Sequence, residues 1–202
     1  MLEEAKAKAL NAYSYLAAER KIHPGVVADA MLGVVPAGLD IKSLFAEYID
    51  QLTEARDAST KRPGRPQKSG GMTPQEHLAQ AQGLAEKLSE CVSRCAGWLA
   101  FFNTDASHRI SAIRFRKPYA KEFRLFKPYE RGGVFGLNLF PTAETLSLKF
   151  LDNSLLVTEG EFNVLQLQSL CRRRLPENEL PAYVNACAVG GVSNADLRTI
   201  IA

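Results

Sequence analysis

The stretch "LLVTEGEFNVLQL", Leu155–Leu167, contains the change of pattern that decides the fold. It begins as a short apolar run, continues through an acid and a glycine, and ends with apolar residues at helical spacing. This order predicts a strand over Asn153–Thr158, a turn at Gly160 and a helix over Phe162–Arg173. Glu159 falls between the strand and the helix, which is an expensive position for a core residue and a suitable one for a catalytic acid.

The residues that follow repeat the same order. A second strand is predicted over Tyr183–Val189 and a second helix over Ala195–Ile201. Alternation of strand and helix is typical of a parallel sheet. The last residue of a parallel strand lies at the edge of the sheet where ligands bind, which makes Glu159 a candidate catalytic residue. The alternative is structural, because Glu159 could cap the helix through the amides of residues 160–162.

Helices and a linker dominate the first half of the chain. Thr73 is a candidate N-cap and Glu76 is placed to complete a capping box. Residues 55–74 are rich in Pro, Gly, Ser, Lys and Arg and have almost no large apolar residue, so we expect a basic disordered linker there. The expected helices are Leu2–Arg20, Val26–Leu32, Ile41–Glu54 and Thr73–Gly97.

Basic and aromatic residues alternate in the middle of the chain, where strands are expected over Trp98–Phe102, Arg109–Arg116 and Phe123–Phe126. Residues 108–131 contain eight Lys and Arg against two Glu, a net charge of +6, whereas the whole chain carries only +3. Such a local excess indicates a polyanionic partner.

Alternation within "RISAIRFR" predicts that Ile110, Ala112 and Phe115 face inward and that Arg114 and Arg116 face outward. The outward arginines are candidates for binding phosphate. The alternative is an ordinary solvated strand face.

Composition excludes several classes of protein. The chain of 202 residues has 46% hydrophobic and 23% charged residues, as globular proteins do. No apolar run approaches the roughly 18 residues of a membrane span, and the charged start is unlike a signal peptide. The four cysteines have no histidine at zinc-ligand spacing, so no zinc is expected. We therefore expect a cytoplasmic protein with no membrane partner.

Taken together, these motifs resemble the catalytic core of bacterial-type DNA primases. "LLVTEGEFNVLQL" is similar to the first motif of the Toprim domain, a hydrophobic strand that ends in Glu-Gly before a helix. "AYSYLAAERKIHPGVVADAMLGVVPAG" resembles the opening of the primase core, and the basic strands lead to Phe135–Gly136–Leu137, similar to the family's aromatic-Gly-Leu. "NACAVGGVSNADLRTIIA" resembles the strand, loop and helix that follow the Toprim glutamate.

The resemblance implies an α+β fold in four segments. Residues 1–54 would be the helical part of an N-terminal subdomain and residues 55–74 the basic linker. Residues 75–145 would add a helix and the basic mixed β part, and residues 146–202 would form a partial Toprim α/β unit with a parallel sheet.

The resemblance also implies an activity, which is template-directed nucleotidyl transfer that makes RNA primers for DNA replication. Glu159 would be the catalytic acid, and Glu159 with Asn163 would bind Mg²⁺ or Mn²⁺. Single-stranded DNA and nucleoside triphosphates would be the partners, with a replicative helicase as a further candidate. The basic residues implied to bind them are Arg114, Arg116, Lys121, Arg124 and Lys127.

Three departures from the family pattern bear on the activity. Asn163 stands where the family usually has Asp, the family's Asp-x-Asp metal motif does not occur, and no zinc-ribbon precedes the core. We expect the chain to be a fragment of a longer primase or primase-helicase. The alternatives are a non-catalytic nucleic-acid-binding Toprim-like module and, more remotely, a Toprim topoisomerase or nuclease.

Overall fold

The computed structural model describes residues 2–60, 71–105, 109–128, 133–139, 156–174 and 186–189. It is an α+β fold with a mixed sheet. The chain divides into two compact units, one of residues 38–94 and one that joins residues 1–37 to residues 95–202. These units differ from the four expected segments, because the first helices pack with the sheet and the two middle helices pack with each other.

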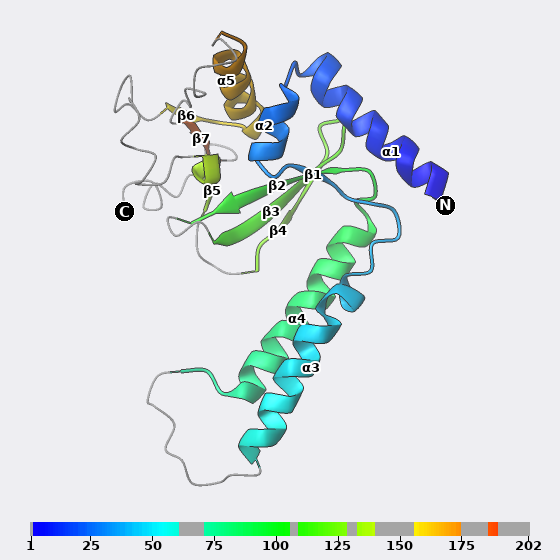
Figure 1. Cartoon of the computed structure of the whole chain (residues 1–202), viewed down its shortest axis with the longest axis vertical. Helices are drawn as coiled ribbons and strands as arrows, with labels where there is room; N and C mark the ends of the chain where they lie inside the picture. Colours follow the sequence, from blue (N-terminus) through cyan, green and yellow to red (C-terminus); the bar gives the residue numbers. More distant parts are fainter. Residues whose placement is uncertain are drawn as a thin grey trace. The chain divides into compact units, whose positions relative to one another are not determined.

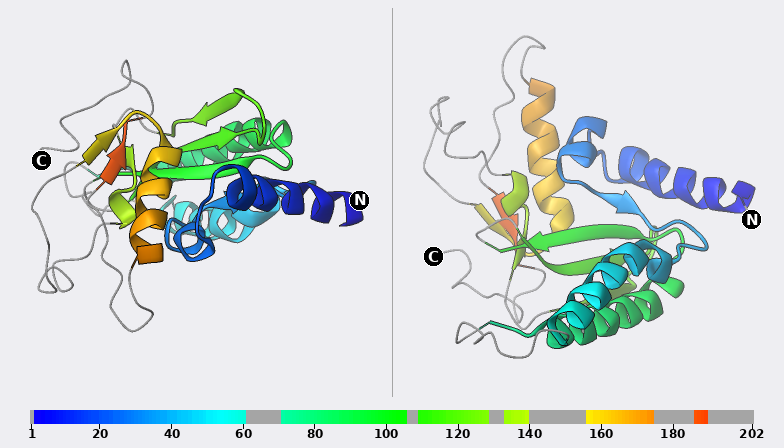
Figure 2. Two further views of the ribbon diagram at one scale, coloured as in Figure 1. Left: turned by 90° about the horizontal axis from the view of Figure 1, so that it is seen from above. Right: turned by 60° about the horizontal axis from the view of Figure 1, so that its bottom comes forward.

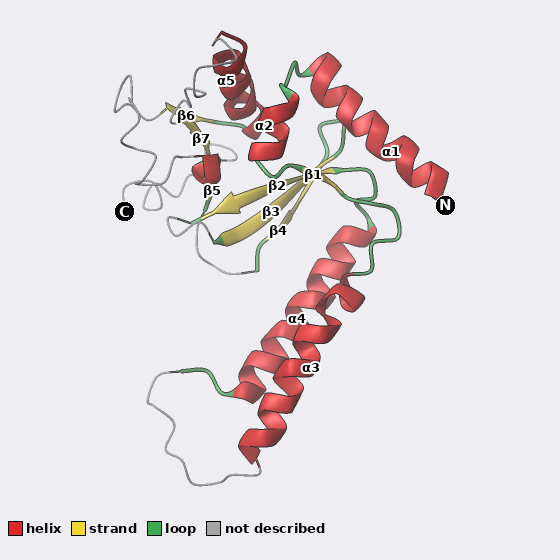
Figure 3. Ribbon diagram, viewed as in Figure 1, coloured by secondary structure: helices red, strands yellow, loops and turns green. Residues whose placement is uncertain are grey.

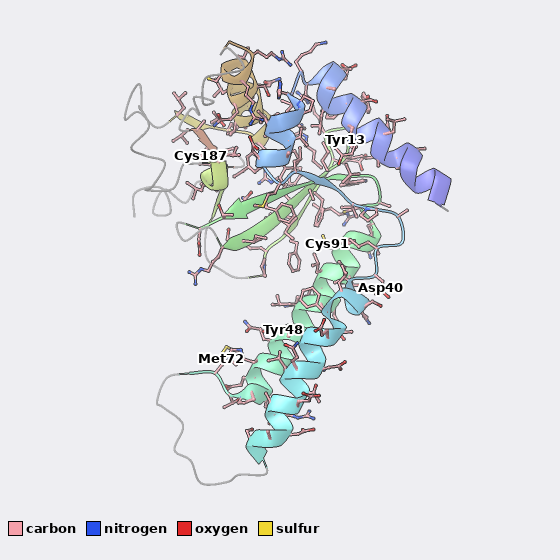
Figure 4. All side chains as sticks on the ribbon, in the orientation of Figure 1. Tyr13, Asp40, Tyr48, Met72, Cys91 and Cys187 are labelled. Carbon is pink, nitrogen blue, oxygen red and sulfur yellow. The ribbon has the colours of Figure 1, made fainter. Side chains whose placement is uncertain are left out.

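The smaller unit is a pair of helices, α3 (Ile41–Thr60) and α4 (Pro74–Ser93), which lie side by side (Figure 1). The carboxylate of Asp40 lies at the start of α3, where it accepts hydrogen bonds from the amides of Lys42 and Ser43 at 3.0 and 3.2 Å (Figure 4). Such bonds satisfy amides that have no partner within the helix. No capping signal marks the C-terminal end of α3 in the sequence, and the predicted helix therefore ended at Glu54 rather than Thr60.

The predicted start of α4 is confirmed. The Thr73 hydroxyl accepts a hydrogen bond from the Glu76 amide at 3.1 Å, and the Glu76 carboxylate accepts one from the Thr73 amide at 2.7 Å. This reciprocal pair is the predicted capping box, with Pro74 in the first turn. Two predicted boundaries were wrong: residues 55–60, assigned to the linker, continue α3, and α4 ends at Ser93 rather than Gly97. Residues 61–70 of the predicted linker lie outside the described residues.

The larger unit contains the sheet and the remaining helices (Figure 3). Its helices are α1 (Leu2–Ser14), the π-helix η1 (Tyr15–Glu19), α2 (Pro24–Asp29), the 3₁₀-helix η2 (Leu137–Leu139) and α5 (Glu161–Arg174). Its strands are β1 (Gly33–Val34), β2 (Leu99–Thr104), β3 (Ile110–Arg116), β4 (Phe123–Phe126), β5 (Val134–Phe135), β6 (Leu156–Thr158) and β7 (Ala186–Ala188).

The strands form one sheet in the order β4-β3-β2-β5-β7-β6, with β1 paired to β2. All of these pairs are antiparallel except β6 and β7, which are parallel. The predicted parallel strands on either side of a helix are therefore confirmed in β6, α5 and β7. The predicted helix over Ala195–Ile201 lies outside the described residues.

Helices cover one face of this sheet and form the main core with it. Both views of Figure 2 show α5 next to α2, and buried side chains of α1, η1, α2 and α5 pack against β2, β5 and β7. Phe101 of β2 is the centre of this core, with its ring centroid 5.4 Å from that of Phe162 and 5.5 Å from that of Phe135. Edge-to-face contacts at these distances favour packing beyond the burial of area.

The short helix α2 is capped by a histidine. His23 Nδ1 accepts a hydrogen bond from the amide of Gly25 at 3.1 Å, and Pro24 opens α2. The predicted helix Val26–Leu32 is therefore shifted toward the N-terminus, because the cap and the proline set its start.

Candidate functional site

The strand, acid, glycine and helix lie where the sequence predicts them. β6 ends at Thr158, Glu159 and Gly160 form a bend, and α5 begins at Glu161. The Thr158 hydroxyl lies 3.2 Å from the carbonyl oxygens of Gly160 and Cys187, either of which can accept its proton. The Val189 amide donates to the carbonyl of Thr158 at 3.1 Å. The bend is thus fixed to both strands of the parallel pair.

Glu159 is exposed at the carboxyl end of β6, and Asn163 is exposed in the first turn of α5. Among the residues that the structure describes, Glu159 makes no hydrogen bond to the start of α5, so the alternative role as a helix cap has no support in the geometry. Because no described residue pairs with this exposed carboxylate, it is available to a ligand.

The glycine of the motif is not required by the geometry of the bend. A Cβ added at Gly160 would meet nothing within 4 Å, and its φ lies outside the left-handed region. The predicted turn at Gly160 is confirmed, but other residues would fit at this position. Gly136, from the aromatic-Gly-Leu segment, is constrained by contrast: its φ is +101°, and an added Cβ would lie 2.7 Å from the carbonyl oxygen of Ala186.

Glu159 and Asn163 do not by themselves make a metal centre. A hard divalent cation takes about six oxygen ligands and favours charged carboxylates. Within the described ranges, no group of three or more His, Cys, Asp or Glu residues could hold a metal ion. The two residues supply one charged and one neutral ligand, which falls short of such a set.

Arg114 does not face outward as predicted. Its guanidinium lies 2.9 Å from a carboxylate oxygen of Glu161, and the two side chains are only 12% and 2% exposed. The pairing of Arg114 with Phe101 across β2 and β3 places this arginine on the sheet face that α5 covers. The buried ion pair therefore connects the basic strand to the first turn of α5.

Arg116 lies on the same covered face but has a different environment. Its guanidinium carbon is 4.8 Å from the centroid of the Phe162 ring, and that of Arg20 is 4.5 Å from the same centroid. Arg20 Nε donates a hydrogen bond to the Tyr15 hydroxyl at 2.7 Å, whereas Arg116 Nε is buried and has no hydrogen-bond partner among the described residues. The prediction that Arg116 faces outward is thus also wrong, although its side chain is only partly buried.

The other predicted phosphate ligands lie on or beside β4, and the five basic residues do not line a single face. Lys121, Arg124 and Lys127 are exposed. Arg124 pairs with Phe115 and so lies on the opposite sheet face from Arg114 and Arg116, because directly paired residues share a face. Ala112 and Phe115 are buried as predicted, at 6% and 2% exposed, although strand alternation places them on opposite faces of β3. The predicted inward position of Ile110 is wrong, because this residue is 46% exposed.

Sequence reasoning missed three residues that organise this site: Arg20, Glu161 and Phe162. Glu161 and Phe162 belong to the segment Leu155–Leu167, but the arginines of β3 that they contact lie about 45 residues earlier in the sequence. An acid and an aromatic at the first turn of a helix, in a chain with an unbalanced basic strand, were the available signals.

None of the described helices combines the length and the apolar composition that crossing a membrane requires. Comparison with known proteins gives no further assignment: no family model, no curated protein and no solved structure matches this chain.

Proposed function

We propose that this chain is the nucleic-acid-binding part of a primase-type core, which holds single-stranded DNA and nucleoside triphosphates for template-directed primer synthesis. The resemblance of the sequence to DNA primases supports the activity. The observation that carries the proposal is the Arg114–Glu161 ion pair, because it holds the basic strand β3 against the helix that follows Glu159. The ion pair thus brings a basic residue of β3 into contact with an acid two positions after Glu159, although the two are far apart in the sequence.

In this proposal the exposed Lys121, Arg124 and Lys127 attract the phosphates of the template or of the incoming nucleotide. Contacts of this kind position a strand without reading its sequence. Glu159 would take part in binding Mg²⁺ or Mn²⁺, with Asn163 as a neutral second ligand, and further acidic ligands would have to complete the set. A replicative helicase is a further proposed partner on the resemblance alone.

One observation favours a second candidate, a nucleic-acid-binding module without catalysis. Asn163 carries no charge, and no metal-binding group of three residues occurs in the part of the chain that the structure describes. Such a module would use the same basic surface and would bind single strands equally well with or without a divalent cation.

A single set of assays separates the two candidates. The chain is incubated with a single-stranded template, labelled nucleoside triphosphates and Mg²⁺ or Mn²⁺, and template binding is measured in parallel with and without the metal. The primase proposal predicts a labelled product that Glu159→Gln abolishes while template binding is unchanged. Glu86→Gln, at another exposed acid, is the matched control and should leave the product unaffected.

Binding that ignores the metal, with no product, would instead establish the non-catalytic module. A chain that binds no single strand at low salt would contradict both candidates.

A further inference from the structure

Two aromatic rings of the hairpin formed by β3 and β4 are exposed rather than buried in the core. Tyr119, in the connection between the strands, is 54% exposed, and Phe123, the first residue of β4, is 64% exposed. Aromatic side chains contribute most of their stabilisation when buried, so two exposed rings in one hairpin make it a candidate interaction surface.

Phe123 lies among the arginines of β3. It pairs directly with Arg116, and the guanidinium carbon of Arg114 is 5.5 Å from its ring centroid. The ring is therefore on the same sheet face as Arg114 and Arg116. Arg114 contacts the ring while its charge is paired with Glu161, and most of the ring surface remains open to solvent.

Tyr119 is held in place at a conformational cost. Its φ is +59°, a region that residues other than glycine, Asn and Asp rarely adopt. Its ring packs edge-on against the buried Tyr15, with centroids 4.7 Å apart, and still presents about half of its surface to solvent. A strained backbone that fixes an exposed ring is a feature found more often at functional sites than elsewhere.

The charges beside these rings are complementary to a polyanion. Arg116 and Arg20 contact the ring of Phe162, and neither forms an ion pair with a carboxylate among the described residues. Lys121 is exposed in the connection between Tyr119 and Phe123. A cationic face with fixed aromatic rings is the combination by which proteins bind single strands, since each base has a π-face that can stack on a ring.

We infer that Tyr119 and Phe123 form a stacking platform for the bases of a single-stranded nucleic acid, with Arg116 and Lys121 beside it as phosphate ligands. This inference rests on the proposed function and specifies where the strand lies. A duplex is not the expected ligand, because its bases are stacked on each other and cannot offer their faces to the rings.

The test measures fluorescence anisotropy with labelled single-stranded oligonucleotides of about 15 nucleotides, which is within the site sizes of such proteins. Phe123→Leu and Tyr119→Gly are the variants. Phe123 is exposed, so a leucine there should fold, and glycine relieves the positive φ of Tyr119. Each variant should weaken binding about 5- to 100-fold, as the loss of one stacked base does. The dependence of binding on salt should not change, since no cation is removed.

Two controls identify stacking as the cause. Tyr13→Leu replaces a 48% exposed tyrosine of α1 that lies two positions before Tyr15 and hence on the other side of the helix, and it should bind as the unmodified chain does. An oligonucleotide of the same length built from abasic sites keeps the phosphates but has no bases. All of these proteins should bind it with equal affinity.

The outcomes are distinguishable. If the unmodified chain binds the single strand and both hairpin variants bind it equally well, the stacking platform is overturned while the proposed function stands. If the substitutions lower the affinity for the abasic oligonucleotide as much as for the normal one, the rings do not act by stacking. If the unmodified chain binds no single strand, the proposed function fails, and the inference fails with it.

Discussion

Two arginines of strand β3, Arg114 and Arg116, lie in different environments. At the start of α5, Arg114 is paired with Glu161 and nearly all of that carboxylate is buried. Two residues further along, at the hairpin, Arg116 contacts the ring of Phe162 and forms no ion pair with an acid among the described residues. An arginine within a basic run is therefore structural or available for ligand binding according to whether an acid lies opposite it. Neighbouring positions of one strand can differ in this respect.

The largest expected effect comes from breaking the ion pair. Glu161→Ala leaves the charge of Arg114 in a mostly buried site, and we expect a loss of about 3 kcal/mol in the free energy of unfolding. Urea denaturation followed by circular dichroism measures it. The double variant Arg114→Met with Glu161→Leu should recover most of the loss, because it removes both charges together. A double-mutant cycle with no coupling between the two positions would contradict the structural role of the pair.

The next largest effect concerns the packing of Gly136 against β7 and α5. In Gly136→Ala, the alanine would have to adopt the positive φ of Gly136. Its Cβ would lie 2.7 Å from the Ala186 carbonyl oxygen and 3.2 Å from a methyl group of Val164. Strain of this kind costs about 1–3 kcal/mol, so the thermal midpoint should fall by several degrees. Gly160→Ala is the matched control, since nothing obstructs its methyl group. Equal losses from both substitutions would show that the two glycines are not distinguished as the structure indicates.

Arg116→Gln tests whether Arg116 and Arg114 have different roles. This change should leave the free energy of unfolding within about 1 kcal/mol of the unmodified value, since no ion pair is lost. Binding of a single strand should weaken several-fold, and the slope of log affinity against log salt should fall by about 0.7. Calorimetry and anisotropy measure the two quantities. A large loss of stability with unchanged affinity would assign Arg116 the structural role of Arg114.

The smallest expected effect concerns Asp40 and Glu76, the exposed acids at the starts of α3 and α4, which unlike the buried Glu161 of α5 are in contact with water. Hydrogen bonds from the Ser43 hydroxyl and amide lower the pKa of Asp40 below its usual 3.8, and the bond from the Thr73 amide lowers that of Glu76 below 4.5. Both acids therefore stabilise the fold above these usual values, and this contribution is lost as the pH falls through the lowered values. Helicity measured by circular dichroism should decline slightly below about pH 4.

Asp40→Asn is the control for this pH dependence, because asparagine caps a helix without titrating. The decline in helicity should be smaller in that variant. An identical pH profile would show that the charge of Asp40 does not contribute to the cap.

Local features of the fold could be predicted from the sequence, and the features that depend on distant partners could not. The capping box of Thr73 and Glu76 and the end of β6 at Thr158 follow from signals a few residues apart, and both are confirmed. The extension of α3 to Thr60 was missed because its polar composition resembles a linker, while packing against α4 stabilises it.

The candidate site shows the same division. The exposure of Glu159 follows from its place between a strand and a helix, as predicted. The orientation of Arg114 and Arg116 was wrong because arginine on a strand is ordinarily solvated, and the acid and the ring that bury these two lie in α5. Only the tertiary fold brings that helix onto the strand.

Binding of single-stranded nucleic acid by the basic hairpin and its neighbours is best tested by the affinity of the unmodified chain for a labelled oligonucleotide across salt concentrations. We expect binding at about 50 mM salt that weakens steadily toward 200 mM, with a slope of about −0.7 for each phosphate neutralised. Absence of binding at the lowest salt, or an affinity that does not change with salt, would show that the hairpin is not a nucleic-acid-binding surface.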